Sequence, residues 1–191
     1  MAGPGLTQYL IAKQFEDFQW VVRQFNHDVA NKLSRVTTEC SIINRMLDRV
    51  PPEEIFADLA LVGEGKQLAA AAQKVVDGLG KTREFFWPPE NTEEATRQRW
   101  SPYDAAAWDK MIVQFHGYLT ERLEPVVPLF EKLTVLEGSG AVKLDGRGKQ
   151  LLNSRASISE GIGEVETLLA AETWDSLLPE WIERREKQAS A

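Results

Sequence analysis

The chain has 191 residues, of which 43% are hydrophobic and 27% charged, and its formal net charge is −7. This composition is ordinary for a globular protein with its own core and excludes an intrinsically disordered chain. The negative charge argues against binding to nucleic acid, because nucleic-acid-binding proteins gather Lys and Arg against the phosphates. The single cysteine, Cys40, excludes an internal disulfide framework and a multi-cysteine metal site.

The first residues lack a basic stretch followed by an apolar run, so we expect no signal peptide. No segment approaches the roughly 18 uninterrupted apolar residues that a membrane-spanning helix needs. The sequence therefore predicts a soluble, cytoplasmic protein with no membrane contact.

A long helix is predicted over residues 7–49, which contain neither Pro nor Gly. Thr7 is the expected N-cap, and Pro51-Pro52 ends the helix. Apolar side chains recur along it at spacings of four and three, as in the seam of a coiled coil. The seam consists of Ile11, Phe15, Phe18, Val22, Phe25, Val29, Leu33, Val36, Cys40, Ile43, Leu47 and Val50. Because Cys40 lies on the seam, we expect it to be buried.

A second helix is predicted over residues 52–86, followed by a linker over residues 87–102. Ser101, Pro102 and Asp104 then form a helix start, with Ser as N-cap, Pro in the first position and an acid in the first turn. Pro125 and Pro128 should interrupt this third helix, because proline lacks the amide donor and clashes with the preceding turn.

The C-terminal part of the chain begins with a glycine-rich connection, residues 138–148. This connection could hold a short hairpin around Val135 and Val142. A fourth helix is predicted over residues 149–172, and a short amphipathic tail helix follows it. The six tryptophans are expected to anchor the core or an interface.

These elements predict an all-α protein in which two long antiparallel helical hairpins form a four-helix bundle with a short C-terminal helix. The expected domains are a hairpin over residues 1–86, the linker 87–102, and a second hairpin with its tail over residues 103–191. A weak similarity between residues 21–33 and 111–123, which matches His27 with Gly117, suggests a duplication and a bundle within one chain. Otherwise the first hairpin could form the bundle as a homodimer.

His27 is the most informative residue for function. At about 100° per residue it lies roughly 200° around the helix from Phe25, so it should face solvent while Phe25 and Val29 face the core. Arg23, His27 and Asn31 are four residues apart and share the outer face. An exposed imidazole offers a ring nitrogen that can act as a reversible nucleophile, and a cation and an amide beside it can hold a phosphoryl group.

The stretch His27-Asp28-x-x-Asn31-Lys32-Leu33 resembles the dimerisation and histidine-phosphotransfer hairpin of two-component signalling, especially the sporulation-type histidine phosphotransferases. The similarity covers residues 15–86. It implies that His27 is the phosphoacceptor, Asp28 its acid/base neighbour and Asn31 a positioning residue.

The resemblance further implies a protein partner, a receiver domain whose aspartate exchanges the phosphoryl group and which itself holds the magnesium ion. We expect Arg23, Lys32 and Arg35 to contact this partner. The ATP-binding α/β domain of sensor kinases does not follow residue 86, so the protein should relay phosphoryl groups with no ATP site and no cofactor of its own.

Two other functions remain open from the sequence. The protein could be a non-catalytic helical adaptor, assembly subunit or regulator that binds another protein through its bundle surface. It could also hold a small ligand between helices near Pro125 and Pro128. Two histidines without a Glu-x-x-His pair do not predict a di-metal site, so no metal is expected.

Overall fold

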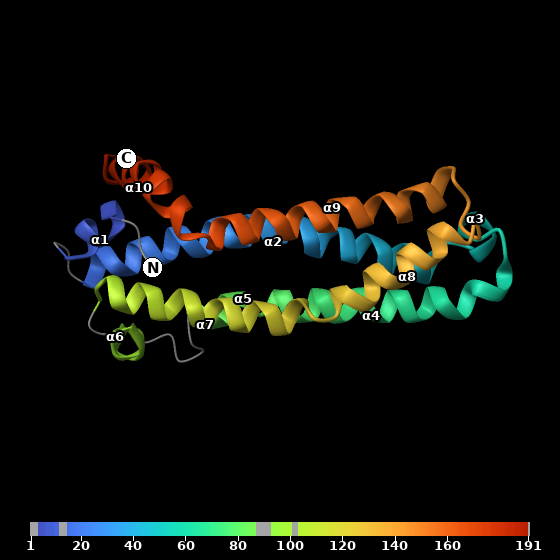
Figure 1. Cartoon of the computed structure of the whole chain (residues 1–191), viewed down its shortest axis with the longest axis horizontal. Helices are drawn as coiled ribbons and strands as arrows, with labels where there is room; N and C mark the ends of the chain where they lie inside the picture. The colour runs from blue at the N-terminus through green and yellow to red at the C-terminus, as the bar shows by residue number, and fades with distance from the viewer. Residues whose placement is uncertain (1–3, 12–14, 87–92, 101–102, 191) are drawn as a thin grey trace. The chain divides into compact units, whose positions relative to one another are not determined.

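The computed structural model describes residues 4–11, 15–86, 93–100 and 103–190, and in these ranges the chain is all-α (Figure 1). The described residues contain no strand, and their one isolated β-bridge joins Phe56 to Val142. None of the described helices is long and apolar enough to cross a membrane.

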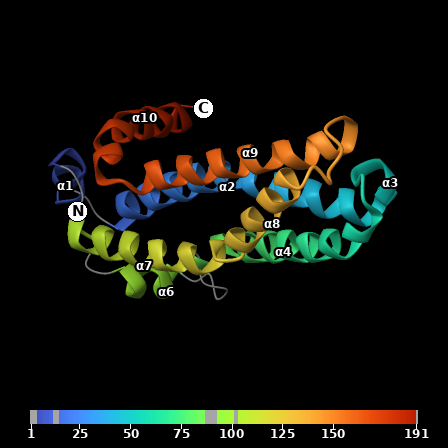
Figure 2. The same cartoon turned by 45° about the vertical axis from the view of Figure 1, so that its right-hand side comes forward.

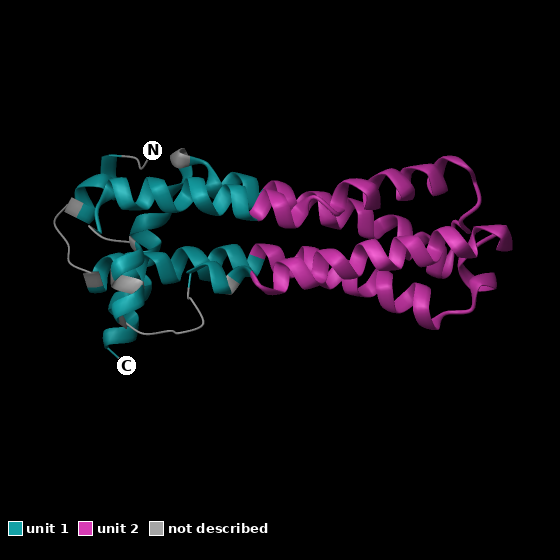
Figure 3. Cartoon of the chain, turned by 90° about the horizontal axis from the view of Figure 1, so that it is seen from below, with its two compact units in different colours: residues 1–31, 82–118, 164–191 teal, residues 32–81, 119–163 magenta. Residues whose placement is uncertain are grey.

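The chain divides into two compact units (Figure 3). Unit 1 comprises residues 1–31, 82–118 and 164–191, and unit 2 comprises residues 32–81 and 119–163. Three helices contribute residues to both units: α2 (Phe15–Arg49), α7 (Ala105–Leu123) and α9 (Gly146–Leu169). Each unit therefore takes segments from early and late parts of the sequence.

Unit 1 has an aromatic core. It contains parts of the three shared helices together with α1 (Pro4–Ile11), α5 (Thr82–Phe86), α6 (Glu93–Trp100) and α10 (Ala171–Ala189). The Phe25 ring meets Phe86, Trp108 and Phe115 nearly edge-on, with centroids 5.9, 5.4 and 5.9 Å away. Trp108 in turn packs edge-on against Trp174 at 5.5 Å. Such T-shaped pairs add stability beyond the area that they bury.

Unit 2 is built from segments of α2 and α9 together with α3 (Pro52–Ile55), the 3₁₀ helix η1 (Leu59–Leu61), α4 (Val62–Gly80) and α8 (Val126–Gly138). Within this unit α9 runs beside α2, and α8 lies against α4 (Figures 1 and 2). Polar side-chain pairs connect α2 to α4, α4 to α8, α8 to α9 and α9 back to α2. In that order the pairs are Asn44 with Gln73, Glu64 with Lys132, Glu137 with Arg155, and Glu160 with Arg35.

The apolar seam of α2 is confirmed over most of its length. The seam residues from residue 18 to residue 43 are buried: Phe18, Val22, Phe25, Val29, Leu33, Val36, Cys40 and Ile43. Near the helix end the seam prediction fails, since Met46 is buried and Leu47 is partly exposed. Burial raises the pKa of Cys40 to about 12, so this thiol is an unreactive part of the core.

Two predicted elements are wrong. The second helix is not continuous over residues 52–86, because Phe56 adopts an extended conformation and bridges to Val142. Two backbone hydrogen bonds flank this bridge, from Ala57 to Ala141 and from Lys143 to Ile55, and replace the helical ones. The hairpin around Val135 and Val142 is also absent, since Val135 lies within α8.

Several helix ends differ from the prediction. Thr7 lies inside α1 and is not the N-cap of a long helix, which begins at Phe15. Asp104 caps α7, because its Oδ1 accepts a hydrogen bond from the Ala107 amide at 2.9 Å. Ser101 and Pro102 lie outside the described residues, as do residues 87–92 of the predicted linker, while residues 93–100 of that linker form α6.

In the second half of the chain, Pro125 separates α7 from α8, as predicted. Pro128 does not break α8, because it lies in the first turn, where its missing amide is not needed. The fourth helix begins at Gly146, three residues earlier than predicted, and the tail helix α10 is 19 residues long.

Gly161 permits a close contact between α9 and α2 in unit 2. A Cβ atom at this position would lie 2.9 Å from Val36 Cγ2, whereas a Cβ at Gly163 would meet nothing within 4 Å. We expect Gly161→Ala to lower the free energy of unfolding by about 1–3 kcal/mol, because the buried Val36 must move. Gly163→Ala should raise it by about 0.5–1 kcal/mol, through better helix propensity. Urea unfolding followed by circular dichroism measures both, and equal values would contradict the close packing.

Candidate histidine site

His27 lies in unit 1 on the outer face of α2, and its side chain is 63% exposed. This exposure agrees with the phase of the apolar seam, because Phe25 and Val29 on either side are fully buried. The packing of Phe25 and Val29 holds the helix backbone at this point, while the ring of His27 remains exposed to solvent.

Two polar side chains meet the same ring nitrogen of His27. Its Nδ1 lies 3.2 Å from Asp28 Oδ1 and 3.2 Å from Asn31 Nδ2. One nitrogen cannot donate to the carboxylate and accept from the amide at once, so the two contacts correspond to different tautomers. When Nδ1 carries the proton and donates to Asp28, Nε2 keeps its lone pair. No hydrogen bond of the described residues involves Nε2.

Asp28 is a half-buried carboxylate with several donors. Trp181 Nε1 donates to Oδ2 at 2.8 Å, and Arg184 Nη1 donates to Oδ1 at 3.0 Å. Burial by itself raises the pKa of Asp28, but the hydrogen bonds from Trp181, His27 and Arg184 together outweigh it and hold the pKa below its ordinary value. Asp28 is therefore ionised at neutral pH, which favours the His27 tautomer that carries its proton on Nδ1.

Trp181 and Arg184 both belong to α10, so Asp28 connects this helix to α2. We call Asp28, Trp181 and Arg184 the α10 anchor. Arg184 also donates to Glu180 Oε1 at 2.6 Å, and its hydrogen bonds to Asp28 and Glu180 raise its pKa. The carboxylate that orients His27 thus also holds the C-terminal helix in place.

Further contacts fix α10 within unit 1. Asp175 accepts hydrogen bonds from the amides of Gly5 and Leu6 at the start of α1, at 3.1 and 2.9 Å. Arg185 forms an ion pair with Asp17 on α2. Together with the α10 anchor, these contacts make α10 an integral part of the unit.

The structure brings together only part of the predicted site. His27 contacts both Asp28 and Asn31, and Arg23 is exposed on the same helix. Lys32 and Arg35 belong to unit 2.

In unit 2, Arg35 Nη2 lies 2.6 Å from Glu160 Oε2, so this guanidinium already has a carboxylate partner. Sequence reasoning missed Trp181 and Arg184, because no periodic signal connects α10 to residues more than 150 positions earlier.

The chemistry available at the site is that of one nucleophilic nitrogen beside a carboxylate that is ionised at neutral pH. The described residues contain no group of three or more His, Cys, Asp or Glu side chains arranged to hold a metal ion. The residues of the site could instead orient an imidazole and stabilise positive charge that develops on it during a transfer reaction.

The fold and the site define an all-α protein with an exposed histidine next to an ionised carboxylate. No protein-family model matches the sequence, and neither a characterised protein nor a solved structure shows significant similarity to it.

Proposed function

We propose that this protein is a phosphorelay protein that passes a phosphoryl group between a receiver-domain aspartate and His27, without an ATP site of its own. The observation that carries the proposal is the geometry of His27, an exposed imidazole whose Nδ1 faces the ionised Asp28 at 3.2 Å. Asn31, one turn further along α2, lies beside the same ring and would position it.

The proposed step needs no group beyond the two proteins and the metal of the partner. The Nε2 lone pair attacks the phosphorus of the aspartyl phosphate, the N–P bond forms, and the P–O bond to the receiver breaks. The receiver carboxylate leaves with the electron pair of that bond. The ring of His27 becomes cationic and keeps its Nδ1 proton, and the negative charge of Asp28 stabilises it. The resemblance to histidine phosphotransferases assigns the magnesium ion to the receiver.

The test is transfer of radioactive phosphate from a panel of phosphorylated receiver domains. We expect acid-labile label on the wild-type chain and none on His27→Ala or His27→Gln, because both variants lack the proposed nucleophile. His116→Gln is the matched control, since it removes the other histidine of unit 1 and should leave the label unchanged. His27 is exposed, so its substitution should change stability by less than about 0.5 kcal/mol. Equal labelling of His27→Gln and wild type would contradict the proposal.

An adaptor function without catalysis is the alternative, and one observation favours it. The Asp28 carboxylate holds α10 through Trp181 and Arg184, so this residue has a structural role that requires no reaction at His27. Absence of transfer from every receiver tested, with the chain folded, would select the adaptor function.

We further propose that the two helical hairpins form a four-helix bundle. The proposal is supported by the polar side-chain pairs of unit 2, which connect α2 to α4, α4 to α8, α8 to α9 and α9 back to α2. A bundle completed within one chain favours a monomer over a homodimer, and light scattering measures the difference.

A further inference from the structure

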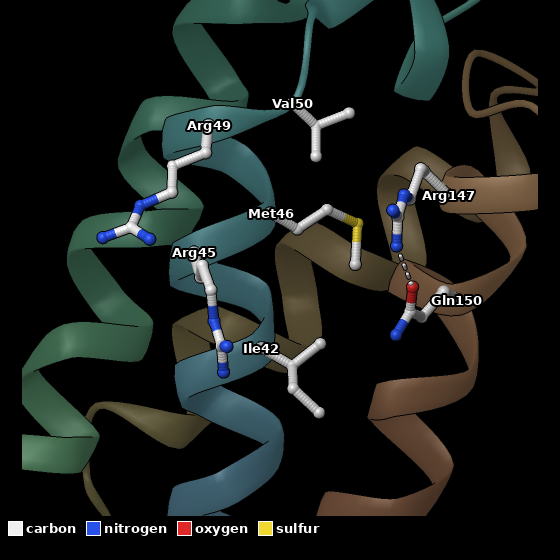
Figure 4. A pocket seen from close by; sticks show the side chains of 7 residues that line it. All are labelled: Ile42, Arg45, Met46, Arg49, Val50, Arg147 and Gln150. Atoms are coloured by element: carbon white, nitrogen blue, oxygen red, sulfur yellow. Dashed lines mark hydrogen bonds between the residues drawn. The ribbon is translucent and has the colours of Figure 1, made fainter.

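A pocket of about 520 Å³ opens in unit 2 between the end of α2 and the start of α9 (Figure 4). The apolar side chains of Ile42, Met46 and Val50 form its floor. They are four residues apart at the end of α2. Met46 is buried, whereas Ile42 and Val50 remain partly exposed. The volume lies within the range of about 300–1,000 Å³ that is usual for small-molecule sites.

Arginines surround this floor, and no acidic residue lines the pocket. Arg45 and Arg49 project from α2 on one side of Met46, and Arg147 from the first turn of α9 stands on the other side (Figure 4). We call this site the arginine pocket. Gln150, the remaining lining residue, accepts a hydrogen bond from Arg147 at 3.3 Å.

Among the described residues, these arginines form no ion pair. Asp48 and Asp145 line neighbouring hollows, but neither forms an ion pair with the arginines. Among the described residues, Arg45 and Arg49 have no carboxylate partner within ion-pair distance. The Arg49 side chain extends away from Met46 and Arg147, so the positive side of the pocket consists mainly of Arg45 and Arg147 (Figure 4).

Arg147 lies in the first turn of α9, two residues after Asp145. The first turn of α9 contains no acidic residue, although the helix dipole favours negative charge at that end. A bound anion would add negative charge at this helix end, which the dipole favours. The pocket therefore combines an apolar floor with a positive rim.

We propose that the arginine pocket binds a small amphiphilic anion, an alkyl phosphate or alkyl carboxylate. The hydrocarbon chain lies along Ile42, Met46 and Val50, and the guanidinium groups donate hydrogen bonds to the head group. The planar fork of arginine donates two parallel N–H···O bonds to a phosphate or carboxylate, which an ammonium group cannot do. This site lies in unit 2 and does not depend on the proposed phosphotransfer at His27.

Isothermal titration calorimetry with decyl phosphate below its critical micelle concentration tests the proposal on the full chain. We expect saturable binding of one molecule, and at least tenfold weaker binding by Arg147→Gln and by Arg45→Gln. Inorganic phosphate should not bind at the same concentrations, because it cannot use the apolar floor. Absence of binding to decyl phosphate, or equal binding of both phosphates, would overturn the proposal.

The control variant is Arg155→Gln, which removes the same charge from an exposed position in the same unit, paired there with Glu137. Its affinity for decyl phosphate should equal that of the wild type. If Arg155→Gln weakens binding as much as Arg147→Gln, general electrostatics explains the binding and the pocket does not. A third titration uses vesicles of anionic phospholipid. If the vesicles bind more tightly than decyl phosphate and Arg147→Gln abolishes that binding, the site recognises a membrane surface and the proposed free ligand is wrong.

Discussion

Trp181→Ala is expected to destabilise unit 1 by about 3–5 kcal/mol, the usual result of replacing a buried tryptophan. The Trp181 side chain is fully buried, and its ring lies 6.5 Å from that of Trp108. Its removal leaves a cavity in the aromatic core and takes a hydrogen bond from the ionised Asp28. We expect the loss to release α10, because two of the three residues of the α10 anchor lie on this helix.

The control for this prediction is Trp181→Phe, which keeps most of the ring but not the indole N–H. It should cost about 1.5–3 kcal/mol, because the lost hydrogen bond is one to a charged group. Urea unfolding followed by far-ultraviolet circular dichroism is the suitable measurement, since all six tryptophans lie in unit 1 and fluorescence would change with the substitution itself. A loss below about 1 kcal/mol for Trp181→Ala would mean that α10 does not contribute to the core as described.

The α2 helix shows which part of the fold could be predicted from the sequence. Its seam depends only on the helical period, so the burial of Phe25, Val29 and Cys40 follows from the spacing of apolar residues along one segment. The same phase correctly places His27 in solvent. Helix ends were less predictable, because several polar residues near a helix start can act as its cap, and Asp104, expected in the first turn, caps α7.

The errors concern contacts between distant segments. Phe56 leaves the helical conformation because it pairs with Val142, a residue that no local pattern connects to it. Likewise, the helical phase shows that Asp28 lies near the edge of the buried face, but not that Trp181 and Arg184 cover it. The arginine pocket is a further case, since Arg147 lies about a hundred positions after Arg49 in the sequence.

Asp28→Asn is expected to lower the free energy of unfolding by about 1.5–3 kcal/mol at neutral pH, because it replaces a charged acceptor of hydrogen bonds by a neutral one. The effect should depend on pH. The pKa of Asp28 is lower in the folded protein than its ordinary value of 3.8, so its ionised form stabilises the fold above that pH. This stabilisation is lost as the pH falls through the lower folded value.

Urea unfolding of wild type and Asp28→Asn at neutral pH and again well below pH 3.8 measures this dependence. The difference between the two proteins should be full at neutral pH and should shrink in acid, whereas other carboxylates titrate alike in both and cancel. A difference that stays constant over this range would contradict the charged α10 anchor.

Arg184→Gln separates the two roles of Asp28, because it weakens the α10 anchor while His27 and Trp181 keep their contacts with the carboxylate. If Asp28 acts on the His27 ring, phosphoryl transfer should fall in Asp28→Asn and persist in Arg184→Gln, even where both variants lose stability. If transfer falls in both in proportion to the lost stability, the carboxylate acts by holding α10. The comparison is informative because Asp28 is the point at which the nucleophile and the C-terminal helix share one negative charge.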